Sequence, residues 1–307
     1  NIMREKRLVK IAKEFYLNGV KDEEFIMKAI ETKNLTYKYS VGSPFETTAV
    51  DDVSLTVEQG EFIGIIGHTG SGKSTLIQHL NGLLKQTSGD VLINERNIWS
   101  KDVNIKDIRF EVGLVFQYSE YQLFEETVYK DIAFGPKNMG LSEEEIDRRV
   151  REAAKNMGLS EELLERSPFD LSGGQKRRVA LAGVIAMEPK ILILDEPAAG
   201  LDPRGKNEIF EGLLAYRRAH GATLILVSHS MEDMAQYCDD VVVMAHAKVL
   251  MAGDRDHIFA RADELEAVGL DIPQITKLCL LLREGGMPMP AGLYTVDSAE
   301  DALVKLF

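Results

Sequence analysis

The segment Gly67-His-Thr-Gly-Ser-Gly-Lys73-Ser74-Thr75 constrains the fold of this chain more than any other part of its sequence. It follows an apolar run at 62–66, which predicts a buried strand, and it leads into a run at 73–84 that predicts a helix. Glycines allow the backbone to wrap closely around a phosphate, and the free amides at the start of a helix attract anions. In this context the spacing Gly-x-x-x-x-Gly-Lys-Ser predicts a phosphate-binding loop in an α/β fold.

The loop also predicts a division of roles among its side chains. Lys73 is expected to contact the β- and γ-phosphates of a bound nucleotide, and Ser74 is expected to offer its hydroxyl to Mg²⁺. We interpret His68 as a spacer and not as a catalytic base. The predicted nucleotide-binding residues of the loop are Gly67, His68, Thr69, Gly70, Ser71, Gly72, Lys73, Ser74 and Thr75.

Two carboxylates follow a second apolar run, in Ile191-Leu-Ile-Leu-Asp195-Glu196-Pro197. Open α/β sheets bind ligands at the carboxyl ends of their strands, which is where both side chains are expected. Asp195 is predicted to help hold Mg²⁺, and Glu196 is predicted to polarise a water for in-line attack. A strand that ends in an ordinary turn can have the same sequence pattern. The functional interpretation of these two carboxylates therefore depends on the phosphate-binding loop that precedes them in the chain.

A second helix start of unusual composition is predicted at Leu171-Ser172-Gly173-Gly174-Gln175. Ser172 and Gln175 have the spacing of a capping box, and the two glycines between them leave the backbone open to an anion. The alternative is an ordinary capped helix, but two glycines cost helix propensity that a plain cap does not require. The chain thus has two predicted phosphate-binding helix ends.

The length of 307 residues allows two structural units, or one large domain with attachments. Residues 1–28 predict a basic amphipathic extension, since five basic side chains at 4–13 accompany one acidic side chain. This extension is either a dispensable segment before an internal start near Met27 or a contact for a membrane surface or a partner. Strand-like runs at 35–39, 53–57, 191–194, 223–227 and 241–244 predict a parallel sheet covered on both faces, together with further β structure.

Two regions outside these strands predict helices. The stretch 142–167 is expected to be helical, with a capping box of Ser142 and Glu145 and one apolar stripe. After Gly253, a helix is predicted to start at Pro273 and to end at Gly285-Gly286, and a last helix is predicted to start at Ser298. The apolar stripes are expected to be Ile146, Val150, Ala154 and Met157 in the first region, and Ile275, Leu278, Leu281 and Leu282 in the second.

Charge and cysteine content exclude several classes of protein. The formal net charge of −13 should repel nucleic-acid phosphates and anionic lipids, so contact with either must be local or made through a partner. Two cysteines cannot form a disulfide framework and fit a reducing compartment. No apolar run approaches the ~18 residues of a membrane-spanning helix, and we expect neither a span nor a secretory signal.

Taken together, these motifs resemble those of the ATP-binding cassette (ABC) ATPases over residues 29–250, with 171–175 as the family's signature. The resemblance implies ATP and Mg²⁺ as cofactors and an α/β P-loop NTPase fold with an antiparallel β-subdomain and a helical subdomain at about 118–172. It implies a domain at 29–252 followed by a C-terminal helical dimerisation segment at 253–307, which is alternatively a structural cap.

The same resemblance implies roles for residues that spacing alone does not assign. Gln117 matches a glutamine that touches Mg²⁺ or the attacking water beside the membrane partner, and His229 matches a histidine that contacts the γ-phosphate. Asp202, in Ala199-Gly-Leu-Asp202, matches a loop that contacts the opposite subunit. Tyr39 fits the aromatic residue that stacks on adenine, with Tyr37 as an alternative, or with Tyr39 as a strand residue that faces the core. In this family two cassettes bind head to tail, and each ATP lies between the loop of one and the signature helix of the other.

The run Phe116-Gln-Tyr-Ser-Glu-Tyr-Gln-Leu-Phe and the later Asp131-Ile-Ala-Phe-Gly-Pro narrow the resemblance to ATPases of energy-coupling factor (ECF) transporters. Ser119 stands where proline is usual in that group. The resemblance is greatest to the second of their two ATPase subunits. It implies a peripheral protein on the cytoplasmic face of the membrane that energises import of a vitamin or a transition-metal ion. The implied partners are a second ABC ATPase, a transmembrane coupling protein and a substrate-binding membrane protein, with no nucleic acid.

Two alternatives remain open. A soluble ABC ATPase that acts on nucleic acid or ribosomes would usually show a long coiled coil, tandem cassettes or a strongly basic face. A non-catalytic ABC-like regulator would not require Lys73, Asp195, Glu196 and His229 together. The pair of cassettes is expected to be a heterodimer, with a homodimer as the alternative. The transported substrate is set by another polypeptide.

Overall fold

A computed structural model describes residues 27–290 and 292–306. Its central sheet consists of β3 (Phe62–Ile66), β6 (Val112–Val115), β7 (Ile191–Asp195), β8 (Thr223–Val227), β9 (Asp240–Ala245) and β10 (Lys248–Asp254). The strand order is β10-β9-β3-β8-β7-β6, with β10 antiparallel to β9 and the remaining neighbours parallel. The predicted strands at 62–66 and 223–227 are confirmed with the same bounds, and those at 191–194 and 241–244 are slightly longer.

The sheet separates two hydrophobic cores, which explains why its strands are apolar on both faces. In β3, Phe62 and Ile66 belong to one core, whereas Ile63 and Ile65 belong to the other. The predicted doubly covered sheet is therefore confirmed. The helices around the sheet are α2 (Lys73–Leu80), α3 (Ile105–Glu111), α8 (Pro203–His220) and α9 (Met231–Tyr237).

Helix α2 ends earlier than the run at 73–84 predicts. Its last helical residue is Leu80, and Gly82 adopts a left-handed φ of 68°. Glycine is the residue that most readily takes this conformation after a helix, where it turns the chain away from the helix axis. The amides of Leu83 and Leu84 donate back to the carbonyl of Gln78, so the stretch after Leu80 forms the helix terminus.

A second, antiparallel sheet lies beside the first and consists of β1 (Lys28–Tyr39), β2 (Thr47–Glu58), β4 (Ser88–Ile93) and β5 (Arg96–Asn97). Its order is β2-β1-β4-β5. This is the antiparallel β-subdomain that the family resemblance implied, and β1 and β2 contain the strands predicted at 35–39 and 53–57. The strand β1 begins at Lys28, one residue before the predicted domain boundary. The helix predicted at 1–28 lies almost wholly outside the described residues.

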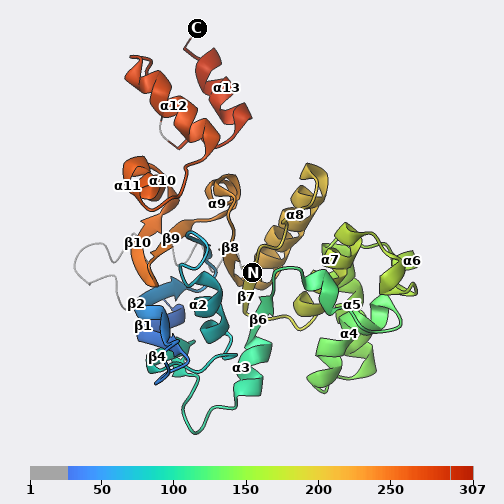
Figure 1. The fold of residues 1–307 in the computed structure, drawn as a ribbon. Helices are drawn as coiled ribbons and strands as arrows, with labels where there is room; N and C mark the ends of the chain where they lie inside the picture. Colours follow the sequence, from blue (N-terminus) through green and yellow to red (C-terminus); the bar gives the residue numbers. More distant parts are fainter. Residues whose placement is uncertain (1–26, 291, 307) are drawn as a thin grey trace, which may run out of the picture.

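A helical subdomain lies on the side of the central sheet away from the antiparallel sheet (Figure 1). The predicted helical stretch 142–167 is wrong in its continuity, because Gly158 takes a φ of 65° and separates α5 from α6. The predicted apolar stripe of α5 is confirmed, since all four of its residues are buried. The subdomain contains η2 (Ser119–Gln122), α4 (Val128–Asn138), α5 (Glu143–Asn156), α6 (Glu161–Leu164), η3 (Pro168–Asp170) and α7 (Gly173–Ile185).

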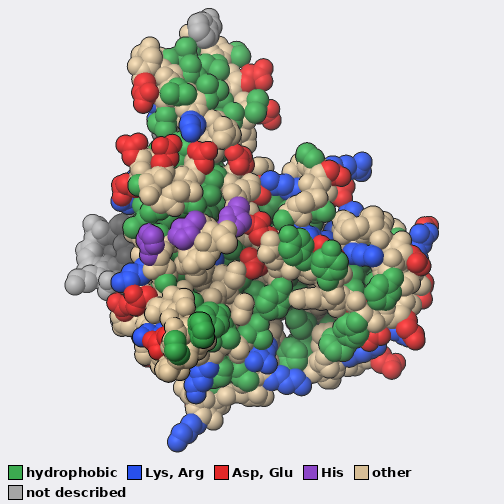
Figure 2. Space-filling model, in the orientation of Figure 1, with side chains coloured by type: hydrophobic (Ala, Val, Ile, Leu, Met, Phe, Trp, Pro, Cys, Tyr) green, Lys and Arg blue, Asp and Glu red, His purple; other side chains and the backbone are tan. Residues whose placement is uncertain are grey.

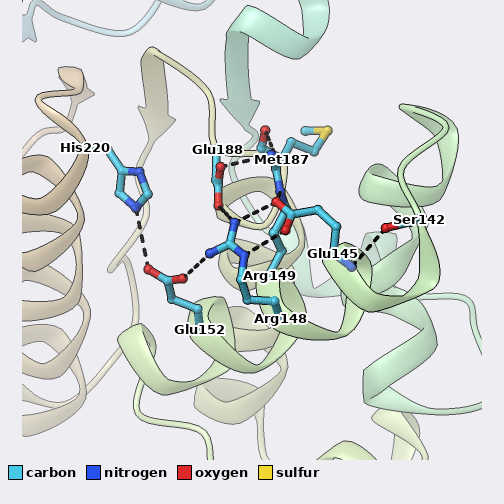
Figure 3. Close-up of polar contacts among 8 residues, drawn as sticks. All are labelled: Ser142, Glu145, Arg148, Arg149, Glu152, Met187, Glu188 and His220. Atoms are coloured by element: carbon cyan, nitrogen blue, oxygen red, sulfur yellow. Dashed lines mark hydrogen bonds and ion pairs between the residues drawn. The ribbon is translucent and has the colours of Figure 1, made fainter.

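An ion-pair network joins α5 to the segment between α7 and β7 (Figure 3). The guanidinium of Arg148 donates to Glu188 at 2.7 Å and to Glu152 at 2.7 Å, and Arg149 donates to the carbonyl of Met187 at 3.2 Å. Glu145 accepts from both arginines, and these hydrogen bonds lower its pKa to about 2. The hydroxyl of Ser142 accepts from the amide of Glu145, but the Glu145 carboxylate pairs with the arginines and does not complete the predicted capping box.

The C-terminal segment consists of α10 (Arg255–Phe259), α11 (Ala262–Ala267), α12 (Gln274–Glu284) and α13 (Val296–Val304). The helix predicted after Pro273 is confirmed, and of its predicted apolar stripe Ile275 and Leu282 pack against a small core around Cys279. Cys279 is buried, whereas Leu278 and Leu281 are exposed. The last helix starts at Val296, two residues before the predicted Ser298, because Thr295 and Ser298 form a capping box.

The helices α12 and α13 project beyond the rest of the fold (Figure 1), and hydrophobic side chains gather on their visible surface (Figure 2). The exposed apolar side chains of these helices are Leu278, Leu281, Val296 and Val304. Among the residues that the structure describes, no helix is both long enough and apolar enough to span a bilayer.

Candidate functional site

The phosphate-binding loop connects β3 to α2, as its sequence predicts. Gly72 occupies the N-cap position of α2 with a φ of 102°, and a Cβ built on it would lie 2.2 Å from the carbonyl oxygen of Ala49. Any larger residue would therefore clash with the β2 backbone as well as strain the turn. No side chain caps this helix end, so its first amides remain available to an anion.

Lys73 places its ammonium inside the loop. Its Nζ donates to the carbonyl of Gly67 at 2.6 Å and to the carbonyl of His68 at 3.1 Å, and the residue is only 7% exposed. Burial lowers the pKa of Lys73, while the charges of Asp195 and Glu196 oppose this shift. A cation is thus held where the loop would enclose phosphate. Ser71, also in the loop, has a buried hydroxyl without a hydrogen-bond partner.

Asp195, the last residue of β7, faces the start of α2. Its Oδ2 lies 3.5 Å from the hydroxyl of Ser74, and the residue is 9% exposed. Burial raises the pKa of Asp195, and the neighbouring charge of Glu196 adds to this effect. A carboxylate and a hydroxyl are oxygen ligands of the kind that Mg²⁺ prefers, so these two residues fit the predicted ion.

Glu196 follows Asp195 in a strained backbone conformation. Its φ is 51°, which is uncommon for a residue other than glycine, and its amide donates to the carbonyl of Val227 at 2.9 Å. The amide of His229 donates to Glu196 Oε1 at 2.7 Å, and the hydroxyl of Ser228 lies 3.3 Å from Oε2. The carboxylate of Glu196 and the backbone of His229 are therefore held together at the ends of β7 and β8.

Tyr39 lies at the rim of the loop. Its hydroxyl is 3.3 Å from the hydroxyl of Thr75, and its ring packs edge-on against Tyr37 with centroids 4.8 Å apart. Tyr37 in turn packs edge-on against His79, a buried residue of α2 whose Nδ1 bonds to the carbonyl of Thr75 at 2.7 Å. Tyr39 is 41% exposed, so its ring is accessible to a ligand, whereas Tyr37 lies behind it. This favours Tyr39 over Tyr37 as the stacking residue.

Histidine side chains form a band on the face shown in Figure 2. Within the loop, the ring of His68 lies 5.8 Å from that of His246, and His68 Nδ1 is 2.8 Å from the carbonyl of Thr69. The hydrogen bonds to the Glu196 carboxylate come from Ser228 and His229, and the interpretation of His68 as a spacer stays a prediction. Thr69 and Gly70 are exposed at the tip of the loop.

The remaining predicted site residues lie on other elements, namely the start of α7, the N-cap of α8 and the segment after β6. Ser172 and Gln175 form the predicted capping box at the start of α7, and Figure 1 shows α7 well apart from α2. Asp202 caps α8 by accepting from the amide of Gly205 at 2.7 Å. Gln117 is exposed just after β6. One chain thus does not bring its two predicted phosphate-binding helix ends together, and Gly173 and Gly174 remain candidates for a ligand held elsewhere.

Sequence reasoning missed Ser228 and Arg177. Ser228 adjoins His229 in the chain, so proximity to a predicted residue was an available signal. Arg177 lay in the basic run after Gln175, but nothing in the run distinguishes it from Arg178. Its contacts with Glu120 and Ala199 depend on tertiary structure.

Comparison with known proteins identifies relatives of the chain. Residues 50–199 match the family model described as ABC transporter. The chain is 53% identical over 278 residues to the energy-coupling factor transporter ATP-binding protein EcfA2 of Clostridium acetobutylicum, covering 90% of this chain and 97% of that protein. The protein of the same name from Clostridium tetani is 53% identical over 280 residues, covering 91% of this chain and 97% of that protein.

Solved structures show the same fold. CbiO1 of Clostridium perfringens, part of the ABC transporter complex CbiONQ, superimposes with a TM-score of 0.70 at 39% identity, covering 84% of this chain and 99% of that chain. An ATP-binding cassette solved as a dimer in a post-hydrolysis state with ADP and Pi gives a TM-score of 0.66 at 28% identity. That comparison covers 74% of this chain and 98% of the cassette.

Proposed function

We propose that this chain, which belongs to the ABC transporter ATPases, is the subunit of an energy-coupling factor transporter that binds and hydrolyses ATP. Its task is to energise uptake of a vitamin or a transition-metal ion through a transmembrane coupling protein. The observation that supports this proposal most directly is the convergence of Lys73, Ser74, Asp195 and Glu196 around one loop.

In the proposed site, the loop amides and Lys73 bind the β- and γ-phosphates, and Tyr39 stacks on adenine. Lys73 exchanges its carbonyl partners for phosphate oxygens, which are better acceptors because they are charged. Glu196 takes a proton from the attacking water. Its carboxylate is oriented for this task by the amide of His229, and in this proposal the side chain of His229 contacts the γ-phosphate.

Ser74 and Asp195 would hold Mg²⁺, with Gln117 as the third predicted contact. When bound, the ion would neutralise charge on the phosphates. Ser74 and Asp195 are already oriented toward each other, and burial together with the neighbouring charge of Glu196 raises the pKa of Asp195. Gln117 is exposed and follows β6, the strand next to β7, so it lies at the same edge of the sheet as Asp195.

A second cassette completes the site. At the start of α7, Ser172 and Gly173 are exposed and Gly174 and Gln175 are half-buried. This helix start lies apart from the loop of its own chain, so it is placed to contact nucleotide bound to another chain. A solved relative is dimeric, which supports the same arrangement here. Asp202 and the exposed apolar residues of α12 and α13 extend this contact, so that residues 253–307 act as a dimerisation segment after the 29–252 domain.

The second-cassette proposal predicts the effect of a bulky side chain at the exposed start of α7. In a Glu196→Gln chain, ATP should drive association with a second cassette, and adding Ser172→Arg should abolish that association while ATP binding by the chain's own loop persists. Sedimentation with and without ATP measures this. Ser160→Arg, at the exposed start of α6, is the matched control. Association that survives Ser172→Arg would contradict the two-cassette site.

The membrane role predicts which proteins accompany the chain. The full chain, tagged and purified from native membranes at the cytoplasmic face, should carry a sister ATPase, a transmembrane coupling protein and a substrate-binding membrane protein in fixed ratio. Mass spectrometry of the purified complex checks this, with a membrane fraction lacking the tag as control. Recovery with ribosomes or DNA in place of membrane proteins would favour the alternative of a soluble ABC ATPase.

A further inference from the structure

One buried side chain contacts two segments that are distant from it in the sequence. Arg177, on α7, is 4% exposed. Its Nε and one Nη donate to the two carboxylate oxygens of Glu120, in η2, at 2.9 and 2.6 Å. The other Nη donates to the carbonyl oxygen of Ala199 at 2.7 Å, and the guanidinium lies 5.9 Å from the centroid of the Tyr118 ring.

These contacts use the geometry that distinguishes arginine from lysine. A planar guanidinium can grip one carboxylate with two parallel hydrogen bonds and still donate to a third acceptor. Burial opposes ionisation of Glu120, but the hydrogen bonds from Arg177 outweigh it and lower the pKa of Glu120. The pair is therefore charged, and breaking it would leave a charge without a partner inside the protein. A contact of this kind makes two segments move as one.

Each contacted segment lies next to a proposed functional residue. Glu120 follows Gln117 by three residues, and Arg177 follows Ser172 by five. Ala199 lies in the turn after Glu196, where its amide donates to the Glu196 carbonyl at 3.3 Å. A continuous path of hydrogen bonds thus connects η2 to the backbone of the proposed base. On the outer side of η2, Tyr118 and Tyr121 are 52% and 84% exposed.

From this path we propose that Arg177 is a positioning residue, which fixes the 117–122 segment, the start of α7 and the turn at 196–202 as one unit. A displacement of the exposed aromatic surface at Tyr118 and Tyr121 then reaches Glu196 and Asp202 through the guanidinium. This inference rests on the proposed function, since it takes Gln117, Ser172 and Glu196 in their proposed roles. It adds a physical connection that none of those residues provides by itself.

Arg177→Lys tests whether the guanidinium connects the two segments. Lysine keeps the positive charge, but its ammonium cannot donate to Glu120 and to Ala199 in the fixed planar geometry of a guanidinium. Hydrogen exchange of the full chain without nucleotide should show faster exchange in both 117–122 and 199–202. The amides of Tyr121 and Leu201, which donate to Tyr118 and Ala198, are the reporters. Arg178→Lys is the matched control, because the neighbouring Arg178 pairs with Glu208 on α8. Exchange that changes in only one segment, or equally in the control, would overturn the proposal.

The second arm measures catalysis in the complex purified with the full chain. Arg177→Lys should lower kcat for ATP by about 10- to 100-fold, the scale of a misplaced catalytic group, with the KM for ATP unchanged. If Arg177 had a purely structural role, the substitution would lower thermal stability without lowering kcat selectively. Equal losses in kcat and in ATP affinity would count against the proposal. Glu120→Gln, which keeps the side-chain shape, should reproduce the result if Arg177→Lys folds poorly. Wild-type protein that hydrolysed no ATP would contradict the proposed function, while the exchange comparison would still decide the role of Arg177.

Discussion

Glu196→Gln should lower the rate of ATP hydrolysis by about 10²-fold or more while ATP still binds, which is the usual scale for the loss of a positioned general base. The substitution removes the basic oxygen but keeps a side-chain carbonyl that can accept from the amide of His229. The local fold should therefore persist. Steady-state hydrolysis and equilibrium binding of ATP, measured on the same preparation, separate the two effects.

Glu188→Gln is a matched control for this substitution. Glu188 also has a left-handed backbone, with a φ of 53°, and it lies before β7, whereas Glu196 follows the other end of that strand. Its carboxylate pairs with Arg148 and Arg149 and has no contact with the loop in the structure. Hydrolysis should be normal in this variant. If Glu196→Gln retained wild-type turnover, Glu196 could not be the base.

Lys73→Ala should weaken ATP binding itself. A charge-assisted hydrogen bond contributes about 1.5–3 kcal/mol, which corresponds to a Kd that rises about 10- to 100-fold. The carbonyls of Gly67 and His68 hold the ammonium inside the loop, and residues 67–75 contain no other lysine or arginine that could replace it. Isothermal titration of the variant with ATP gives the change in Kd directly.

Lys85→Ala controls for the loss of one positive charge near α2. Lys85 is exposed just beyond the helix, where its ammonium lies 5.5 Å from the ring centroid of Trp99. This variant should bind ATP as the wild type does. Normal ATP affinity in Lys73→Ala would contradict the assignment of the phosphate-binding loop, even if turnover were lost.

The parts of this fold that sequence predicts are those whose causes are local. In β3 and in the loop after it, the same few residues determine both the conformation and the chemistry: apolar side chains fill two cores, and Gly72 permits the turn. The capping box of Ser172 and Gln175 spans four residues and forms as its spacing predicts. The resemblance to a family then supplied the antiparallel sheet, which spacing alone did not.

The features that sequence did not predict depend on what each residue packs against. Glu145 has the spacing of a capping residue, but its carboxylate accepts hydrogen bonds from two arginines one turn later and not from the N-cap amide. Leu278 and Leu281 fit an apolar stripe, yet α13 covers the face of α12 that contains Cys279. Ser228 and Arg177 acquire their contacts only when distant segments come together. Such choices among possible partners cannot be resolved from periodicity.

The capping box at the start of α7 has a thermodynamic consequence. The hydroxyl of Ser172 and the amide oxygen of Gln175 bind each other's backbone amides within the folded chain, before any partner arrives. The conformational entropy of this surface is therefore lost during folding. If a second cassette binds here as we propose, each association will cost little further ordering at this surface.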